Sequence, residues 1–168
     1  MKNLWDHKLA SKLKKTPLLL RVYSSQLLGL DSDLVLHGGG NTSVKINETN
    51  IFGEEEEILY VKGSGRNLAT IDTDDFTPLR LAQMKKLVKL KKISDTMLVR
   101  EQQLAMTNPY APSPSVEALL HAIIPFSWID HTHADAVVTL TNTPKGDCLL
   151  YTSPSPRDAT LSRMPSSA

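Results

Sequence analysis

Apolar residues recur every three or four positions in four stretches of the chain, which begin near residues 17, 78, 95 and 114. This spacing gathers apolar side chains on one face of a helix, so we predict four amphipathic helices. Two of the stretches follow a Thr-Pro pair, which favours a helix start because the hydroxyl can cap the first turn and proline fits the first helical position. The stretch 114–124 has the most continuous apolar face.

Shorter apolar segments, bounded by glycine, asparagine or charged residues, predict strands. They lie at residues 33–36, 42–46, 58–61, 126–130 and 136–140. Strands and helices do not alternate as regular βαβ units, and the sequence shows no internal repeat. We therefore expect an α/β or α+β domain built from layers of helices and sheet.

Composition narrows the class of protein. The 168 residues carry a net charge of +1, with 40% hydrophobic and 22% charged residues, which suits one globular domain or part of one. The sequence has no concentrated basic face for nucleic acid and no apolar stretch of membrane-spanning length. The N-terminus lacks the apolar core of a signal peptide, and Cys148 is the only cysteine, so we expect a cytoplasmic protein.

The character of the sequence changes at Cys148. Residues 148–168 are rich in serine and proline and follow no helical or strand period, a composition that permits a disordered tail. The segment also resembles the in-frame translation of a sequencing-library adaptor, because the codons TGT CTC TTA TAC ACA TCT give Cys-Leu-Leu-Tyr-Thr-Ser. We expect residues 1–147 to be the N-terminal part of a domain and residues 148–168 to be a non-native, disordered tail.

Two histidines suggest a metal site. His131 and His133 lie two positions apart in a segment predicted to be extended, so both side chains project from one face and can share one ion. Asp130 and Asp135 flank the pair and can orient the rings. On spacing alone, a pair of hydrogen-bonded histidines with no metal fits equally well.

Glu117 lies one helical turn before His121, beside the apolar face of the helix predicted over 114–124. A carboxylate at a buried helix N-terminus is a candidate metal ligand or general base. Taken alone, however, an ordinary exposed glutamate near the positive end of the helix dipole is the better interpretation.

Two glycine-containing segments, 37–41 and 62–65, offer backbone amides that no side chain obstructs, which suits an anion such as phosphate. Neither matches the dinucleotide-binding or P-loop pattern, and the nucleophile elbow that accompanies His-Gly-Gly-Gly in lipases is absent from the sequence. Either segment alone is equally typical of a tight turn.

Taken together, four segments resemble one family. In chain order they are HGGGNTSVKI, ILYVKGSG, PSVEALLH and DHTHADAV. They are similar to the class II aldolase/adducin family, and most of all to the aldolase half of bifunctional rhamnulose-1-phosphate aldolase/short-chain dehydrogenase proteins. The resemblance covers nearly all of residues 1–147 and implies a three-layer α/β/α domain with a largely antiparallel central sheet, here truncated at its C-terminus.

The resemblance also implies a site. His131 and His133 match two of three histidines that hold a zinc ion, or another divalent transition metal, and Glu117 matches the acidic residue that binds this metal at rest and acts as acid/base in turnover. The residues that would bind the substrate and its phosphate are Gly39, Gly40, Asn41, Thr42, Lys62, Gly63, Ser64 and Ser115. Lys62 and Val116 depart from residues seen in some relatives, a threonine and a serine respectively.

The implied reaction is cleavage of a ketose 1-phosphate, such as rhamnulose 1-phosphate, to dihydroxyacetone phosphate and an aldehyde such as lactaldehyde, as in rhamnose catabolism. The third histidine would follow residue 147, so we expect this chain to be an inactive fragment that lacks a C-terminal dehydrogenase domain. The intact protein is expected to be a homo-oligomer without nucleic-acid or membrane partners. The alternatives are a sugar-phosphate 4-epimerase of the same fold, a non-catalytic adducin-like interaction module and, last, a metal-dependent amidohydrolase.

Overall fold

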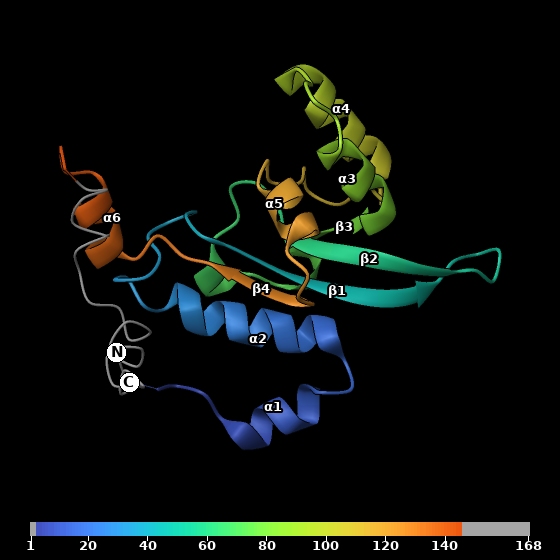
Figure 1. Cartoon of the computed structure of the whole chain (residues 1–168). Helices are drawn as coiled ribbons and strands as arrows, with labels where there is room; N and C mark the ends of the chain where they lie inside the picture. The colour runs from blue at the N-terminus through green and yellow to red at the C-terminus, as the bar shows by residue number, and fades with distance from the viewer. Residues whose placement is uncertain (1–2, 146–168) are drawn as a thin grey trace, which may run out of the picture. The chain divides into compact units, whose positions relative to one another are not determined.

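A computed structural model describes residues 3–145 (Figure 1). These residues form two compact units divided between Thr132 and His133, and each unit is described by itself. None of the helices in the described part of the chain is long and apolar enough to cross a membrane.

The first unit is built on a four-stranded sheet in the order β3-β2-β1-β4, and every neighbouring pair is antiparallel. Its strands are β1 (Asn41–Thr49), β2 (Glu55–Lys62), β3 (Phe76–Arg80) and β4 (Trp128–His131). The β1–β2 hairpin turns at Gly53, whose positive φ of 83° suits glycine. Strand β4 comes from the far end of the unit and, among the residues that the structure describes, pairs only with β1, so it forms one edge of the described sheet.

Helices cover both faces of this sheet (Figure 1). Helix α2 (Pro17–Gly29) lies along one face, with α1 (His7–Leu13) beyond it, whereas α3 (Leu81–Val88) and α5 (Ala118–Ile123) pack on the other. The remaining elements of the unit are α4 (Asp95–Ala105) and two short 3-10 helices, η1 (Leu68–Thr70) and η2 (Thr73–Asp75). The expected three-layer α/β/α architecture with an antiparallel sheet is therefore confirmed.

Strand alternation explains the two cores. On β2, Leu59 and Val61 are fully buried in the core under α3 and α5, while Tyr60 between them packs against the core on the α2 face. Burying one such aliphatic side chain contributes roughly 1.5–3 kcal/mol to the stability of the fold. The sheet is thus fixed from both sides, and the side-chain direction at each strand position is determined.

Four predicted elements differ in the structure. Residues 33–36, predicted as a strand, form a turn in which the amides of Leu34 and Val35 bond to the carbonyl of Asp31. The predicted helix start at Pro78 is wrong, because Pro78 belongs to edge strand β3, where proline is tolerated, and α3 begins at Leu81.

In the second unit, residues predicted as the strand 136–140 form helix α6 (Asp135–Thr141). A short apolar run cannot by itself distinguish strand from helix, and here the acidic residue in the first turn favours a helix.

Helix α5, in the first unit, also begins later than the predicted residue 114, since Pro114 is engaged in a β-bridge with Gly63.

Candidate functional site

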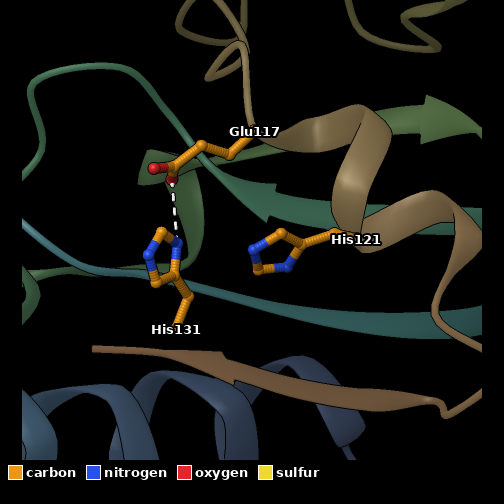
Figure 2. Close-up of side chains that lie close together, drawn as sticks. All are labelled: Glu117, His121 and His131. Atoms are coloured by element: carbon orange, nitrogen blue, oxygen red, sulfur yellow. Dashed lines mark ion pairs between the residues drawn. The ribbon is translucent and has the colours of Figure 1, made fainter. Parts of the chain in front are cut away.

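Three side chains meet between α5 and β4: Glu117, His121 and His131 (Figure 2). Each offers one metal-ligating atom, and these atoms all lie within 4.8 Å of one another. Glu117 is the N-cap residue of α5, and His121 follows one turn later on the same helix face. His131 is the last residue of β4 and pairs with Asn41 at the start of β1.

The carboxylate of Glu117 is the centre of this cluster. Its Oε2 lies 3.4 Å from Nδ1 of His131 and accepts a hydrogen bond of 2.9 Å from Nδ2 of Asn41. The hydroxyl of Ser115 lies 3.5 Å from the same oxygen, at the outer limit of a hydrogen bond, and accepts a bond from the backbone amide of Glu117. Neighbouring polar groups therefore fix the position of the carboxylate.

His121 is fully buried, and its ring is held in one orientation. Its Nδ1 lies 2.7 Å from Oγ of Ser43 on β1, whereas its buried Nε2 has no hydrogen-bond partner among the described residues. Burial lowers the pKa of His121 to about 4, and the nearby charge of Glu117 only partly opposes this effect. The imidazole is therefore neutral at neutral pH, which is the form that binds metal ions.

The residues present fit a divalent metal ion. Two imidazoles and one carboxylate are a ligand set that proteins use for zinc. The hydrogen bond between Nδ1 of His121 and Ser43 orients the ring and leaves Nε2 as the nitrogen that can bind a metal. Hydrogen bonds of this kind commonly orient metal-binding histidines. The buried Oδ1 of Asn41 also lacks a hydrogen-bond partner in the described structure, and such an atom is suited to a bound group.

His121 was not among the candidates that sequence reasoning assigned to the site. Its position four residues after Glu117 was the available signal, because residues at this spacing lie on the same helix face. The spacing cannot tell whether that face meets the end of a strand that carries another histidine.

His133 lies outside the strand that carries His131. Strand β4 ends at His131 and α6 begins at Asp135, so His133 lies in the connecting segment between them and not in the strand. His133 is the first residue of the second unit and is described with that unit. Its role as a ligand stays a prediction.

The glycine segments show two close backbone approaches. A Cβ atom on Gly40, which has φ of 67°, would lie 3.0 Å from the carbonyl oxygen of His131, and one on Gly63 would lie 2.6 Å from Cγ of Pro112. Glycine is therefore required at both positions.

Backbone carbonyls already accept hydrogen bonds from several of the amides expected to bind phosphate. The amide of Gly39 bonds to Leu36, that of Gly63 to Asp75 and that of Ser64 to Ser113. Their binding of phosphate stays a prediction, and it requires these amides to share or exchange their present acceptors.

Lys62 connects the two glycine segments. Its side chain is almost fully buried, and its Nζ donates to the carbonyl of Gly38 at 3.0 Å and to that of Arg66 at 2.8 Å. Burial lowers the pKa of Lys62, and the charge of Glu117 opposes this effect. In this arrangement the ammonium group holds the loops together.

Thr42 lies between Asn41 and Ser43 but points to the opposite face of β1, where its Oγ1 lies 2.8 Å from Oγ of Ser25 on α2. Strand alternation explains the difference, since neighbouring side chains on a strand point to opposite faces. The side chain of Thr42 is therefore not among the groups around Glu117.

Comparison with known proteins identifies the family and the fold of this domain. The sequence model of the "Class II Aldolase and Adducin N-terminal domain" family matches residues 21–163. The chain belongs to this family. The match covers Glu117, His121 and His131, and it extends into the segment 148–168, whose adaptor origin stays a prediction.

Two relatives show how this class II aldolase domain compares with longer proteins. It is 39% identical over 140 residues to the "Uncharacterized oxidoreductase YuxG" of Bacillus subtilis (strain 168), covering 83% of this chain but only 20% of the relative. It also matches the structure of the N-terminal class II aldolase domain of a conserved protein from Thermoplasma acidophilum, with 39% identity and a TM-score of 0.77, over 91% of this chain and 70% of that one. The chain thus spans about a fifth of the first relative's length, and neither name states a substrate.

Proposed function

We propose that this class II aldolase domain contributes to the metal-dependent retro-aldol cleavage of a ketose 1-phosphate, of the rhamnulose 1-phosphate type. The products would be dihydroxyacetone phosphate and an aldehyde such as lactaldehyde. The observation that carries the proposal is the meeting of Glu117, His121 and His131 in a chain that belongs to the aldolase family. Zinc is the proposed ion because two imidazoles and a carboxylate suit it.

In this proposal Glu117, His121 and His131 hold the ion, with His133 as a further ligand that the family pattern implies. When bound, the ion supplies Lewis-acid stabilisation for the negative charge that develops on substrate oxygens during cleavage. His121 contributes a neutral, pre-oriented nitrogen because Ser43 holds the other side of its ring.

Glu117 carries the proton in the proposed reaction. As the carbon–carbon bond breaks, the hydroxyl on the departing carbon loses its proton and becomes the aldehyde carbonyl, and the electron pair of the broken bond stays with the ketone fragment. The carboxylate of Glu117 takes up a proton and delivers it to the carbon of the ketone fragment, so no net proton is gained or lost. The bond from Asn41 keeps Oε2 in place, so the carboxyl group meets the substrate in one orientation.

The substrate phosphate is proposed to bind beside Ser115 and the loop that begins at Gly63. Two contacts place these segments next to each other, the bridge between Gly63 and Pro114 and the bond from the amide of Ser64 to Ser113. Holding a phosphate there would convert its binding energy into correct placement of the reacting carbons near Glu117.

The deciding experiment replaces Glu117 by Gln in a chain extended with its natural downstream sequence and supplied with Zn²⁺. We expect the variant to keep the metal through its histidine ligands and to lose at least about a hundredfold in kcat, the lower end of what general acid–base catalysis supplies. Glu54→Gln, an exposed carboxylate in the β1–β2 turn, is the matched control and should leave kcat unchanged.

Wild-type turnover by Glu117→Gln would remove this residue from the mechanism. Product analysis separates the alternatives, because an epimerase would return a sugar phosphate of unchanged carbon number and an interaction module would bind metal without turnover. We also propose that the 168-residue chain itself binds zinc weakly and lacks activity. Efficient cleavage by that chain would contradict this part of the proposal.

A further inference from the structure

We propose that Arg21, on the sheet face opposite the candidate metal site, is a positioning residue that holds β4 so that His131 meets Glu117. The inference rests on the proposed function in one respect, that His131 is a metal ligand. The residue is part of neither glycine segment, nor of the cluster that carries the chemistry.

Arg21 is a buried charged residue, and each of its three guanidinium nitrogens donates at least one hydrogen bond. Its side chain is only 1% exposed, on the inner face of α2. Nε donates to Oγ of Ser25 at 3.2 Å, and Nη2 donates to Oδ1 of Asp130 at 2.6 Å. Nη1 donates to the backbone carbonyls of Ser43 at 3.3 Å and Ile129 at 3.4 Å. A guanidinium is suited to this task because its rigid, planar donors reach several acceptors at once.

Three consecutive residues of β4 contact this one side chain. Trp128 lies over the guanidinium, with 5.4 Å between Cζ and the ring centroid, Ile129 offers its carbonyl and Asp130 its carboxylate. His131 is the next residue. Because side chains alternate along a strand, Trp128 and Asp130 face α2 while His131 faces Glu117 on the other side. Contacts with Arg21 on the α2 face of β4 therefore set the position of His131 on the opposite face.

Strand β4 needs such an anchor. It is four residues long, and among the described residues it pairs only with β1, at the edge of the sheet. A short edge strand has few ladder bonds to fix its position. Arg21 supplies bonds to both members of the pair, since it reaches Ser43 on β1 and Ile129 directly opposite on β4.

The same contact connects the two histidines of the site. Ser43 accepts a bond from Arg21 at its backbone carbonyl, and its hydroxyl lies 2.7 Å from Nδ1 of His121. The junction of β1 and β4 thus positions His131 directly and His121 through Ser43. Loss of Arg21 would loosen the first histidine more than the second, because α5 carries His121 independently.

The test compares Arg21→Met with Arg21→Lys and a control, Arg80→Met, in the 168-residue chain. Arg80 lies on β3, at the opposite edge of the sheet, donates a hydrogen bond to a backbone carbonyl and forms an ion pair with a carboxylate. Hydrogen exchange is measured at the amides of residues 128–131. We expect Arg21→Met to speed their exchange by about tenfold or more, while amides shared by β2 and β3 keep their rates. Arg21→Lys should rescue part of the protection, and Arg80→Met should leave β4 unchanged.

Two results of the exchange experiment would overturn the inference. Wild-type exchange at β4 in Arg21→Met would show that the strand does not depend on Arg21, and an equal rise across all strands would show a general structural role. If Arg21→Met does not fold, Arg21→Lys and Asp130→Asn replace it, and each must speed exchange at β4 above the rate in β2 and β3.

Binding of Co²⁺, followed by its visible absorption, provides the second measurement. We expect Arg21→Met to weaken Co²⁺ binding by about tenfold to a hundredfold, as substitutions of residues that orient ligands do, with Arg21→Lys in between. An unchanged affinity and spectrum would overturn the link from Arg21 to His131. If the 168-residue wild-type chain binds Co²⁺ too weakly to measure, which its proposed weak zinc binding allows, the exchange rates alone decide the role of Arg21.

Discussion

The two histidines of the candidate site present the same imidazole group, yet the protein holds them in different ways. His121 is fully buried on a helix, and a strand hydroxyl holds its ring. His131 ends a four-residue edge strand, and its side chain is 29% exposed beside Glu117. Folding therefore fixes the side chain of His121 by burying it. The position of His131 depends instead on the contacts of the strand that carries it.

Because of this difference, we expect His121 to contribute to the stability of the fold and His131 to contribute mainly to metal binding. A buried, hydrogen-bonded side chain contributes to stability whether or not a metal is present, whereas a partly exposed one at a strand end contributes little. Substitutions of the two histidines should therefore affect different measurements, and three predictions test this.

The largest expected effect is that of His131→Ala on metal affinity. The substitution removes a ligand, so we expect binding of Zn²⁺ or Co²⁺ to weaken by at least about a hundredfold, the upper end of what residues around ligands contribute. The free energy of unfolding of the metal-free protein should change by less than about 1 kcal/mol because the site is partly exposed. Titration calorimetry and urea unfolding measure the two quantities. His7→Ala, on exposed α1, is the control, and equal metal affinity in the two variants would contradict the assignment.

The next prediction concerns the pH dependence of stability. The pKa of His121 is about 4 in the folded protein against an ordinary value of 6.5, so the unfolded chain binds this proton more readily. The contribution of His121 to stability is therefore complete above about pH 6.5 and is lost as the pH falls toward 4, with a slope of up to about 1.4 kcal/mol per pH unit.

Urea unfolding of the chelator-treated protein between pH 7.5 and 4 measures this loss. His121→Gln removes the titrating group, so the difference in stability between wild type and variant should shrink as the pH falls. A difference that stays constant across this window would show that His121 is not buried in its neutral form.

The smallest expected effect belongs to Ser43→Ala. Removing the hydroxyl leaves Nδ1 of His121 without its partner, which should cost about 1–3 kcal/mol of stability. Metal affinity should fall by about tenfold, because the ring loses the contact that orients it. Ser11→Ala, at an exposed position of α1, is the matched control. Metal affinity and stability equal to those of the control would show that Ser43 does not orient the ring.

Much of the fold was predictable from the sequence because its signals are local. The apolar spacing after Pro17 and after Ser94 predicted α2 and α4, and short apolar segments bounded by polar residues or glycine predicted β1 and β2. Predictions failed where local signals were ambiguous or where a tertiary contact competed with them. Pro78, which suits a helix start, lies in β3, and the short apolar run of α6 is equally compatible with a strand.

The sequence by itself determined the family, the layered α/β architecture and the chemical groups that the protein can use, among them Glu117 and His131. Residue type and motif spacing are sufficient for these conclusions, since both are properties of the chain alone. Only the tertiary structure brought His131 to Glu117 and His121, turned Thr42 toward α2 and bonded Lys62 to two backbone carbonyls. Side-chain alternation sends neighbouring residues of β1 to opposite faces of the sheet. Which helix covers each face, α2 on one side and α5 on the other, is decided only when the layers pack, and no local pattern specifies it.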